Sequence, residues 1–439
     1  MRRETVTEES IAEARVLARE QPSAGLPVLA RRLLGFGWQV DRERPSARIP
    51  YFEEAAAVWR SLLADGSDEH LEAAARAIFS LGLQYSLAHA DDRSLAAKDE
   101  AAVLARRLNR HRDEERKDVK ILGASAHGLA EAGRFDRAVT VQREVVDIYR
   151  ATTGPGGHSS PTGLMWSLLD LAVYLDLAGQ TDASLEIERE TLHLNRRIAE
   201  AEPSHLPGLV IWLAGVTPRF ADTGHPREAG ELLDEAVAGC DRLPPEGDRG
   251  NFGFHQGVQA ALFARSGARD ERTCGDGAVP IGVSPDPRAL RPVLGVSFHW
   301  WAFSVREAYR AGREVIDDAI STAGDRSALD PAQLAALGTL VRRRTIRQSV
   351  AFDSAPRQFT EKVIPALAES VALERRLAAA RQDSGPGRLV RSLTDQAMGH
   401  LVTGAHSAAG EALREARDLH AAAESTRTPM TRTTTDGQD

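Results

Sequence analysis

The sequence has few of the residues that build sheets, disulfide frameworks or membrane spans. Aromatic residues make up 5% of its 439 positions, and cysteine occurs twice, at Cys240 and Cys274. Two cysteines outside a CxxC pair cannot form a disulfide framework, so we expect reduced thiols and a cytoplasmic protein. The longest apolar stretch, residues 206–216, is interrupted by Pro207 and Gly208 and is too short to cross a bilayer. No apolar core of a signal peptide follows the N-terminal arginines, and we expect no membrane association.

The charge balance and the absence of known motifs exclude several function classes. Lys plus Arg total 55 and Asp plus Glu total 63, which gives a net charge of −8. Proteins that bind nucleic acid through its phosphates need a basic surface, so we expect no nucleic-acid partner. The sequence has no HExxH, no Cys/His cluster at ligand spacing, no GxxxxGK[ST] and no GxGxxG after a strand. We therefore predict no catalytic, metal-ligating or cofactor-binding residues, and no cofactor.

A helical repeat of about 45 residues runs through the chain. Glycines recur with gaps of 46, 45 and 180 residues, and the last gap is four times 45; they are Gly133, Gly179, Gly224 and Gly404. A leucine precedes each glycine by eleven residues, and small residues occupy the positions seven before and five after it. A fixed long period indicates stacked supersecondary units rather than one globular core.

Each repeat is expected to form two antiparallel helices joined at its glycine. In residues 120–150, Gly133 can adopt the left-handed conformation that ends a helix, and Ala126 and Ala138 let the two helices approach closely. Comparable hairpins are predicted at residues 26–63, 71–108, 167–200, 209–243, 333–380 and 389–423. The predicted fold is an all-α solenoid of about eight or nine hairpins, continuous over residues 1–423. An irregular region covers about 267–289, and residues 424–439 form a disordered tail.

The turn residues resemble those of a known repeat family. Gly133-Arg134-Phe135-Asp136-Arg137-Ala138 is similar to the turn of the tetratricopeptide repeat, as are residues 179–184 and 224–229, and residues 81–85 resemble its first-helix signature. The usual unit of that family has about 34 residues, so this chain looks like a long-unit bacterial variant. The resemblance implies a non-catalytic adaptor or regulatory protein that binds a protein or peptide on its concave face.

The same resemblance implies which side chains line that face. The first helix of each hairpin lines the groove in this family, which points Lys120, His127, Trp166, Asp170 and Asp176 inward. For Trp166 the alternative is a place in the core, where truncation costs about 3–5 kcal/mol.

A second candidate surface is the basic run at residues 342–347. Arg343, Arg344 and Arg347 fall within one arc of a helix, and three guanidinium groups repel one another unless an anion lies opposite. The anion is either an acidic residue of the neighbouring helix, such as Glu361 or Glu369, or a carboxylate or phosphate of a partner.

A rival function remains open. The chain could be a small-molecule sensor or an enzyme with a pocket near residues 267–301, where an irregular loop precedes an aromatic cluster. The identity of the partner and the oligomeric state do not follow from the sequence.

Overall fold

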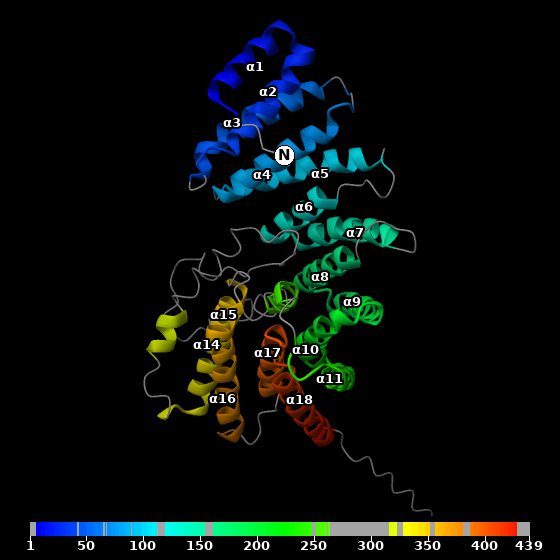
Figure 1. Ribbon diagram of the computed structural model, residues 1–439, viewed down its shortest axis with the longest axis vertical. Coiled ribbons are helices and arrows are strands. Elements are labelled where there is room, and N and C mark those ends of the chain that lie inside the picture. Colours follow the sequence, from blue (N-terminus) through cyan, green and yellow to red (C-terminus); the bar gives the residue numbers. More distant parts are fainter. Residues whose placement is uncertain are drawn as a thin grey trace, which may run out of the picture. The chain divides into compact units, whose positions relative to one another are not determined.

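The fold is all-α in the part of the chain that the structure, a computed structural model, describes (Figure 1). It describes residues 6–427 except 42–43, 65, 67, 89, 111, 113–118, 154–160, 248–251, 261, 264–315, 323–327, 352–355 and 381–386. No strand occurs among these residues. The expected irregular region at 267–289, the alternative pocket at 267–301 and Cys274 lie outside the described residues. The chain divides into two compact units, Met1–Ser184 and Leu185–Asp439, which are described separately below.

The first unit is a run of helices in which each packs against the next along the chain. Its helices are α1 (Glu8–Glu20), α2 (Pro22–Gly37), α3 (Pro45–Leu62), α4 (Leu71–Leu87), α5 (Asp91–Arg110), α6 (Val119–Glu131), α7 (Phe135–Thr152) and α8 (Pro161–Leu177). Helix α1 begins at a capping box, in which Thr7 and Ser10 bond each other's backbone N–H groups. Sequential antiparallel packing of this kind gives a solenoid-like fold, as the repeat predicts.

The second unit contains two groups of helices that are distant in sequence. The first group is α9 (Thr181–Ala201), which begins in the first unit, η2 (Pro203–His205), α10 (Leu206–Asp222) and α11 (Pro226–Asp241). The second is α14 (Pro331–Ala351), α15 (Pro356–Gln358), the π-helical turn η5 (Phe359–Val363), α16 (Ile364–Ala380), α17 (Gly387–Val402) and α18 (His406–Arg427). Helix α18 continues to Arg427, so the first residues expected in the tail are helical. The prediction of one continuous array over 1–423 stays a prediction.

The four glycines that mark the repeat have the predicted backbone conformation. The φ angles of Gly133, Gly179, Gly224 and Gly404 are +71°, +78°, +87° and +78°. In each turn the N–H of the following residue donates to the carbonyl five residues earlier, for example Gln180 to Leu175 at 2.8 Å. This is the Schellman arrangement, in which a left-handed residue lets the chain satisfy the last carbonyl groups of a helix. The helical hairpins with glycine turns are therefore confirmed.

The conformation of Gly179 can be tested without a steric clash. A Cβ atom at this position would have no neighbour within 4 Å, so Gly179→Ala changes the backbone preference alone. We expect it to lower the free energy of unfolding by about 1–2 kcal/mol, the cost of a left-handed conformation for a residue with a side chain. The control is Gly387→Ala, which also has open space but no positive φ and should change stability by less than about 1 kcal/mol. Equal denaturation midpoints for the two variants would contradict this account.

The period of about 45 residues is also present on the N-terminal side of Gly133, where it appears in the positions at which the helices begin. Helices α3, α5, α7, α9 and α11 begin at Pro45, Asp91, Phe135, Thr181 and Pro226, with gaps of 46, 44, 46 and 45 residues. Within the first unit, an arginine on α1, on α3 and on α5 pairs with a carboxylate on the next alternate helix, which is α3, α5 and α7 in turn. Bidentate examples, 38–40 residues apart, are Arg15–Glu54, Arg60–Glu100 and Arg106–Glu144.

Ion pairs between alternate helices, with a similar spacing along the sequence, also occur within the second unit. Arg189 pairs with Glu228 and Arg196 with Glu235, both 39 residues apart, and Arg375 of α16 pairs with Glu415 of α18 at a spacing of 40. The guanidinium of Arg189 lowers the pKa of the Glu228 carboxyl. Most of these side chains are partly exposed, so each pair contributes little stability. Because the two members of each pair are always 38–40 residues apart, successive alternate helices are packed with the same axial alignment.

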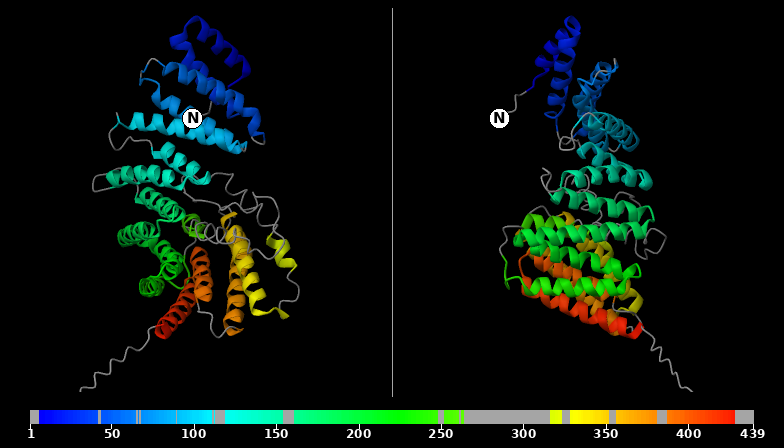
Figure 2. Two further views of the ribbon diagram at one scale, coloured as in Figure 1. Left: turned by 180° about the vertical axis from the view of Figure 1, so that it is seen from behind. Right: turned by 90° about the vertical axis from the view of Figure 1, so that its right-hand side faces the viewer.

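The hairpin that carries Gly404 is not separated from the Gly224 hairpin by four stacked units. Helices α10 and α11 pack directly against α17 and α18, and both views of Figure 2 place α18 beside α11. The pairs run antiparallel, since Arg391 near the start of α17 contacts Asp222 at the end of α10. Arg414 of α18 likewise contacts Asp241 at the end of α11, at 3.0 Å. The 180-residue gap, a multiple of the period, therefore joins two hairpins that close on each other.

Candidate binding surfaces

The predicted groove residues of the first unit divide into buried and accessible positions. Lys120, near the start of α6, is exposed, and Asp176, near the end of α8, is half-buried. His127, Trp166 and Asp170 are buried, and the Trp166 side chain is only 1% exposed. The burial corrects the expectation that these three side chains present themselves to a partner in an open groove. Because α6 and α8 are separated by one antiparallel helix, they run parallel, and Lys120 and Asp176 lie at opposite helix ends.

The burial of this face follows from the composition of the inner helices. Every residue of α8 from Gly163 to Leu175 is buried, and α6 is buried from Ile121 to Ala130. A helix that is apolar on all sides is covered on all sides, whereas a groove helix needs one polar, accessible stripe. The signal was present in the sequence, since residues 164–177 carry only two charged side chains, Asp170 and Asp176.

The second unit covers its inner helix α10 with described parts of its own chain. A Cβ atom at Gly208 would lie 3.1 Å from Phe254, and one at Gly215 would lie 2.7 Å from Leu262 and 3.0 Å from the sulfur of Met398. Phe254 belongs to the helical residues 252–260, Leu262 to the helical residues 262–263, and Met398 to α17. Two glycines therefore let α10 pack closely against these segments. The face of α10 that a simple repeat array would leave to a ligand is occupied.

The four arginines of α14 have separate surroundings. Arg344 pairs with Glu369 of α16, which confirms one of the two acidic residues named from the sequence. The other, Glu361, pairs with Arg357 four residues earlier at 2.7 Å. Arg343 and Arg347 are 5% and 1% exposed, so they do not form a patch at the surface. This corrects the solvent-facing interpretation, because the C-terminal half of α14 is buried on nearly every side.

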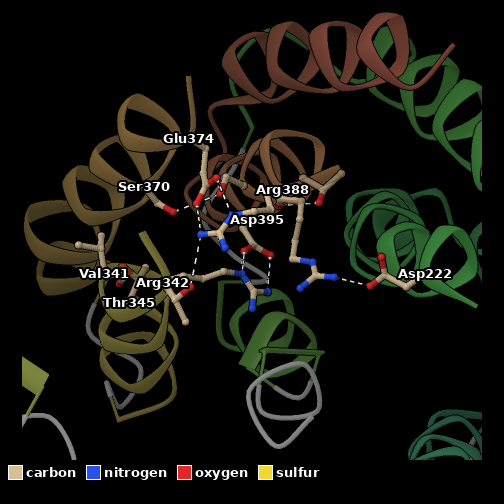
Figure 3. Close-up of polar contacts among 12 residues, drawn as sticks. Asp222, Val341, Arg342, Thr345, Ser370, Glu374, Arg388 and Asp395 are labelled. Carbon is tan, nitrogen blue, oxygen red and sulfur yellow. Dashed lines mark hydrogen bonds and ion pairs between the residues drawn. The ribbon is translucent and has the colours of Figure 1, made fainter. Parts of the chain in front are cut away.

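A polar seam, which the sequence reasoning missed, joins α14, α16, α17 and α10 (Figure 3). Arg342 donates to Asp395 at 2.8 Å, and both side chains are largely buried. Arg388 donates to both oxygens of Glu374 and to the carbonyl of Ala335. About one helical turn after Arg388 on α17, Arg391 pairs with Asp222 of α10.

Room for this seam comes from a glycine inside a helix. A Cβ atom at Gly338 of α14 would lie 2.5 Å from the carboxylate of Glu374. The hydroxyl groups of Ser370 and Ser392 add a buried hydrogen bond at 3.2 Å. Removing one partner of a buried ion pair is costly, while the intact pair adds little net stability. The seam therefore specifies the orientation of α17 relative to α14, α16 and α10, and it adds little to the stability of the fold.

The described residues offer limited chemistry beyond ion pairs. No group of three or more His, Cys, Asp or Glu side chains among them is placed to hold a metal ion. Cys240 is a free, buried thiol, and burial raises its pKa to about 12. A thiol of that kind is a poor nucleophile because little of it is ionised. Within the described part of the chain, no helix is long and apolar enough to cross a bilayer.

The fold defines the class of this molecule as a helical-repeat protein. No protein-family profile and no curated protein matches the sequence. Among solved structures, the chain is similar to one described as "Structure of Naa15/Naa10 bound to HypK-THB", with 12% identity and a TM-score of 0.32 over 93% of this chain. It spans 60% of the length of that chain. A second is a "Circular tandem repeat protein with novel repeat topology and enhanced subunit contact surfaces", with 15% identity and a TM-score of 0.17 over 95% of this chain and 90% of the other.

Proposed function

We propose that this chain is a non-catalytic scaffold of the tetratricopeptide type that binds a protein or peptide partner. The observation that supports the proposal most directly is the recurrence, on alternate helices, of ion pairs whose two members are 38–40 residues apart. Repeats in constant register present side chains at regular intervals over a large surface, which suits recognition of another chain. The buried thiol of Cys240 suits a reducing compartment, and we place the scaffold in the bacterial cytoplasm.

The partner surface that we propose begins at the exposed Lys120. Lys120 is exposed near the start of α6, whereas His127 on the same helix and Trp166 and Asp170 on α8 are buried. A partner therefore meets charge at the helix ends rather than an aromatic anchor in an open groove. Charges at the rim of an interface mainly increase the association rate and select partners of opposite sign. An acidic segment is the partner chemistry that Lys120 fits.

Affinity capture from the cell, with variants, tests this function. Lys120→Glu should weaken capture of the partner by about tenfold, with a reduced dependence on salt. Arg110→Glu is the matched control, because it makes the same change of charge at an exposed position on α5 and should leave capture unchanged. Equal capture by both variants would contradict the role of Lys120. A stoichiometric small molecule in native mass spectrometry, with no captured protein, would overturn the scaffold in favour of the sensor.

A further inference from the structure

The two hairpins that close on each other in the second unit are related in sequence. Residues 223–224 and 229–231 read Thr-Gly and Ala-Gly-Glu, and the same residues recur 180 positions later, at 403–404 and 409–411. Leu209-Val210, Leu213 and Leu233 recur in the same way as Leu389-Val390, Leu393 and Leu413. Each position of α10–α11 therefore has an equivalent in α17–α18, and the closure pairs two copies of one structural unit.

Equivalent helices face each other across the closure, and their contacts are reciprocal. Helix α10 packs on α17 and α11 packs on α18, both antiparallel. His406, at the start of α18, has its Nδ1 2.7 Å from Pro244 O, just beyond the end of α11. His420, in the second half of α18, has its Nε2 2.7 Å from Pro226 O at the start of α11. Such reciprocity is that of a two-fold arrangement, in which two copies of a unit bind each other through the same surface.

The charges at the closure differ between the two hairpins. Arg414 lies 3.0 Å from Asp241, and Arg417, which also contacts the next residue, lies 4.0 Å from Asp234. In both pairs the arginine belongs to α18 and the aspartate to α11. The ion pair between α17 and α10 has the same polarity. The hairpin α17–α18 therefore presents a basic edge to an acidic edge of α10–α11.

Pairing between two like hairpins would place equal charges opposite each other. Position 414 is equivalent to position 234, so a second α10–α11 in the place of α17–α18 would set Asp234 against Asp241. A second α17–α18 in the place of α10–α11 would set Arg414 against Arg417. Like charges in contact across an interface are unfavourable and select against the wrong pairing. The charges therefore distinguish two hairpins whose backbones are equivalent.

We propose that the α10–α11 surface binds an α17–α18 hairpin by charge match, whether that hairpin belongs to the same chain or to a second copy. Two copies can then join by exchanging C-terminal segments, which keeps both closures charge-matched and gives a two-fold dimer. Because α16 packs on α17 and α14 packs on α16, the exchanged segment runs from α14 to α18. This self-association surface does not depend on the partner proposed for Lys120.

The natural chain favours its own hairpin. A hairpin on the same chain has a higher effective concentration than one on a second copy, so it occupies the surface first. The side chains of the two ion pairs between α11 and α18 are largely accessible to solvent, and such pairs add little stability. Their role is to select the hairpin that binds. A mismatch of charge within one chain should therefore leave its surface available to a charge-matched second copy.

Two full-length variants with opposite charge reversals test the proposal. Asp234→Arg with Asp241→Arg makes α11 basic, and Arg414→Asp with Arg417→Asp makes α18 acidic. Each variant has like charges across its own closure, but each matches the other. At micromolar concentration an equimolar mixture should form a 1:1 complex with twice the mass of one chain in light scattering, while either variant alone keeps the mass of one chain. A mixture without this complex overturns the proposal, and so does a dimer of either variant alone.

Amide hydrogen exchange shows whether the complex uses the closure. Gly247 N–H donates to Gly404 O at 2.8 Å, and Ser407 N–H donates to Pro245 O at 3.2 Å, so both amides report on the contact between the hairpins. Their protection should fall about tenfold or more in either variant alone and recover in the mixture. A complex that forms without this recovery binds elsewhere and overturns the proposal.

All four changes in one chain make the matched control. They restore opposite charges across its own closure, so this variant should protect Gly247 and Ser407 as the natural chain does and form no complex with it. A loss of protection equal to that of the two-residue variants would mean that the side chains and not their charges matter, which overturns the proposal. If a two-residue variant does not fold, Asp241→Arg and Arg414→Asp test the 3.0 Å pair alone. Their mixture should form the same 1:1 complex, and its absence overturns the proposal as well.

Discussion

Replacing Trp166 with alanine is expected to lower the free energy of unfolding by about 3–5 kcal/mol. The side chain is 1% exposed and lies within the stretch of α8 from Gly163 to Leu175 in which every residue is buried. Removing an indole from such a place forfeits its transfer from water and leaves a cavity that neighbouring helices fill only in part. A denaturant titration of the full chain, followed by circular dichroism, measures the shift.

The control for this prediction is another tryptophan. Trp38, which packs edge to face on Phe52, is 43% exposed. Trp38→Ala should therefore cost about 1 kcal/mol, the size of one exposed aromatic contact. Trp166→Ala could instead unfold at the same denaturant concentration as the natural chain and fail to bind the partner. In that case Trp166 is a groove anchor, and its burial in α8 does not describe its role.

The helices and turns could be predicted from the sequence because they depend on local chemistry. A helical hairpin was expected over residues 71–108, and α4 (Leu71–Leu87) and α5 (Asp91–Arg110) form it. The glycines at 133, 179 and 224 were expected to reverse the chain, and each has a positive φ angle. Both features follow from a few adjacent residues, since apolar periodicity defines the helix and a missing Cβ atom permits the turn.

The closure of the second unit could not be predicted in this way. Arg391 and Asp222 are 169 residues apart, and no local pattern identifies one as the partner of the other. The ion pairs between alternate helices have a regular spacing that could have been noticed. With 55 basic and 63 acidic residues, however, many chance pairs have the same spacing. The partner-binding residues were transferred from a resemblance in which the inner helices keep one face open. The apolar composition of α8, in which every residue from Gly163 to Leu175 is buried, argues against an open face there.

The double substitution Arg343→Glu with Arg347→Glu should prevent the second unit from folding or lower its stability by more than about 4 kcal/mol. Both side chains are buried, at 5% and 1% exposure, on a helix whose other arginines already pair with Asp395 and Glu369. Two carboxylates at these places would be desolvated in surroundings that are arranged for cations. Thermal unfolding and amide exchange in α14 and α16 measure the loss.

Two further variants separate charge from packing. Arg347→Met keeps most of the apolar stem and removes only the guanidinium, so it should be less disruptive than the double substitution. Arg357→Glu makes the same reversal of charge at a side chain that is 89% exposed and should cost less than about 1 kcal/mol. The double variant could instead unfold at the same temperature as the natural chain and bind its partner more weakly, with a steep dependence on salt. That result would mean that Arg343 and Arg347 form an anion-binding surface. In that event the second unit opens in solution far enough to expose α14.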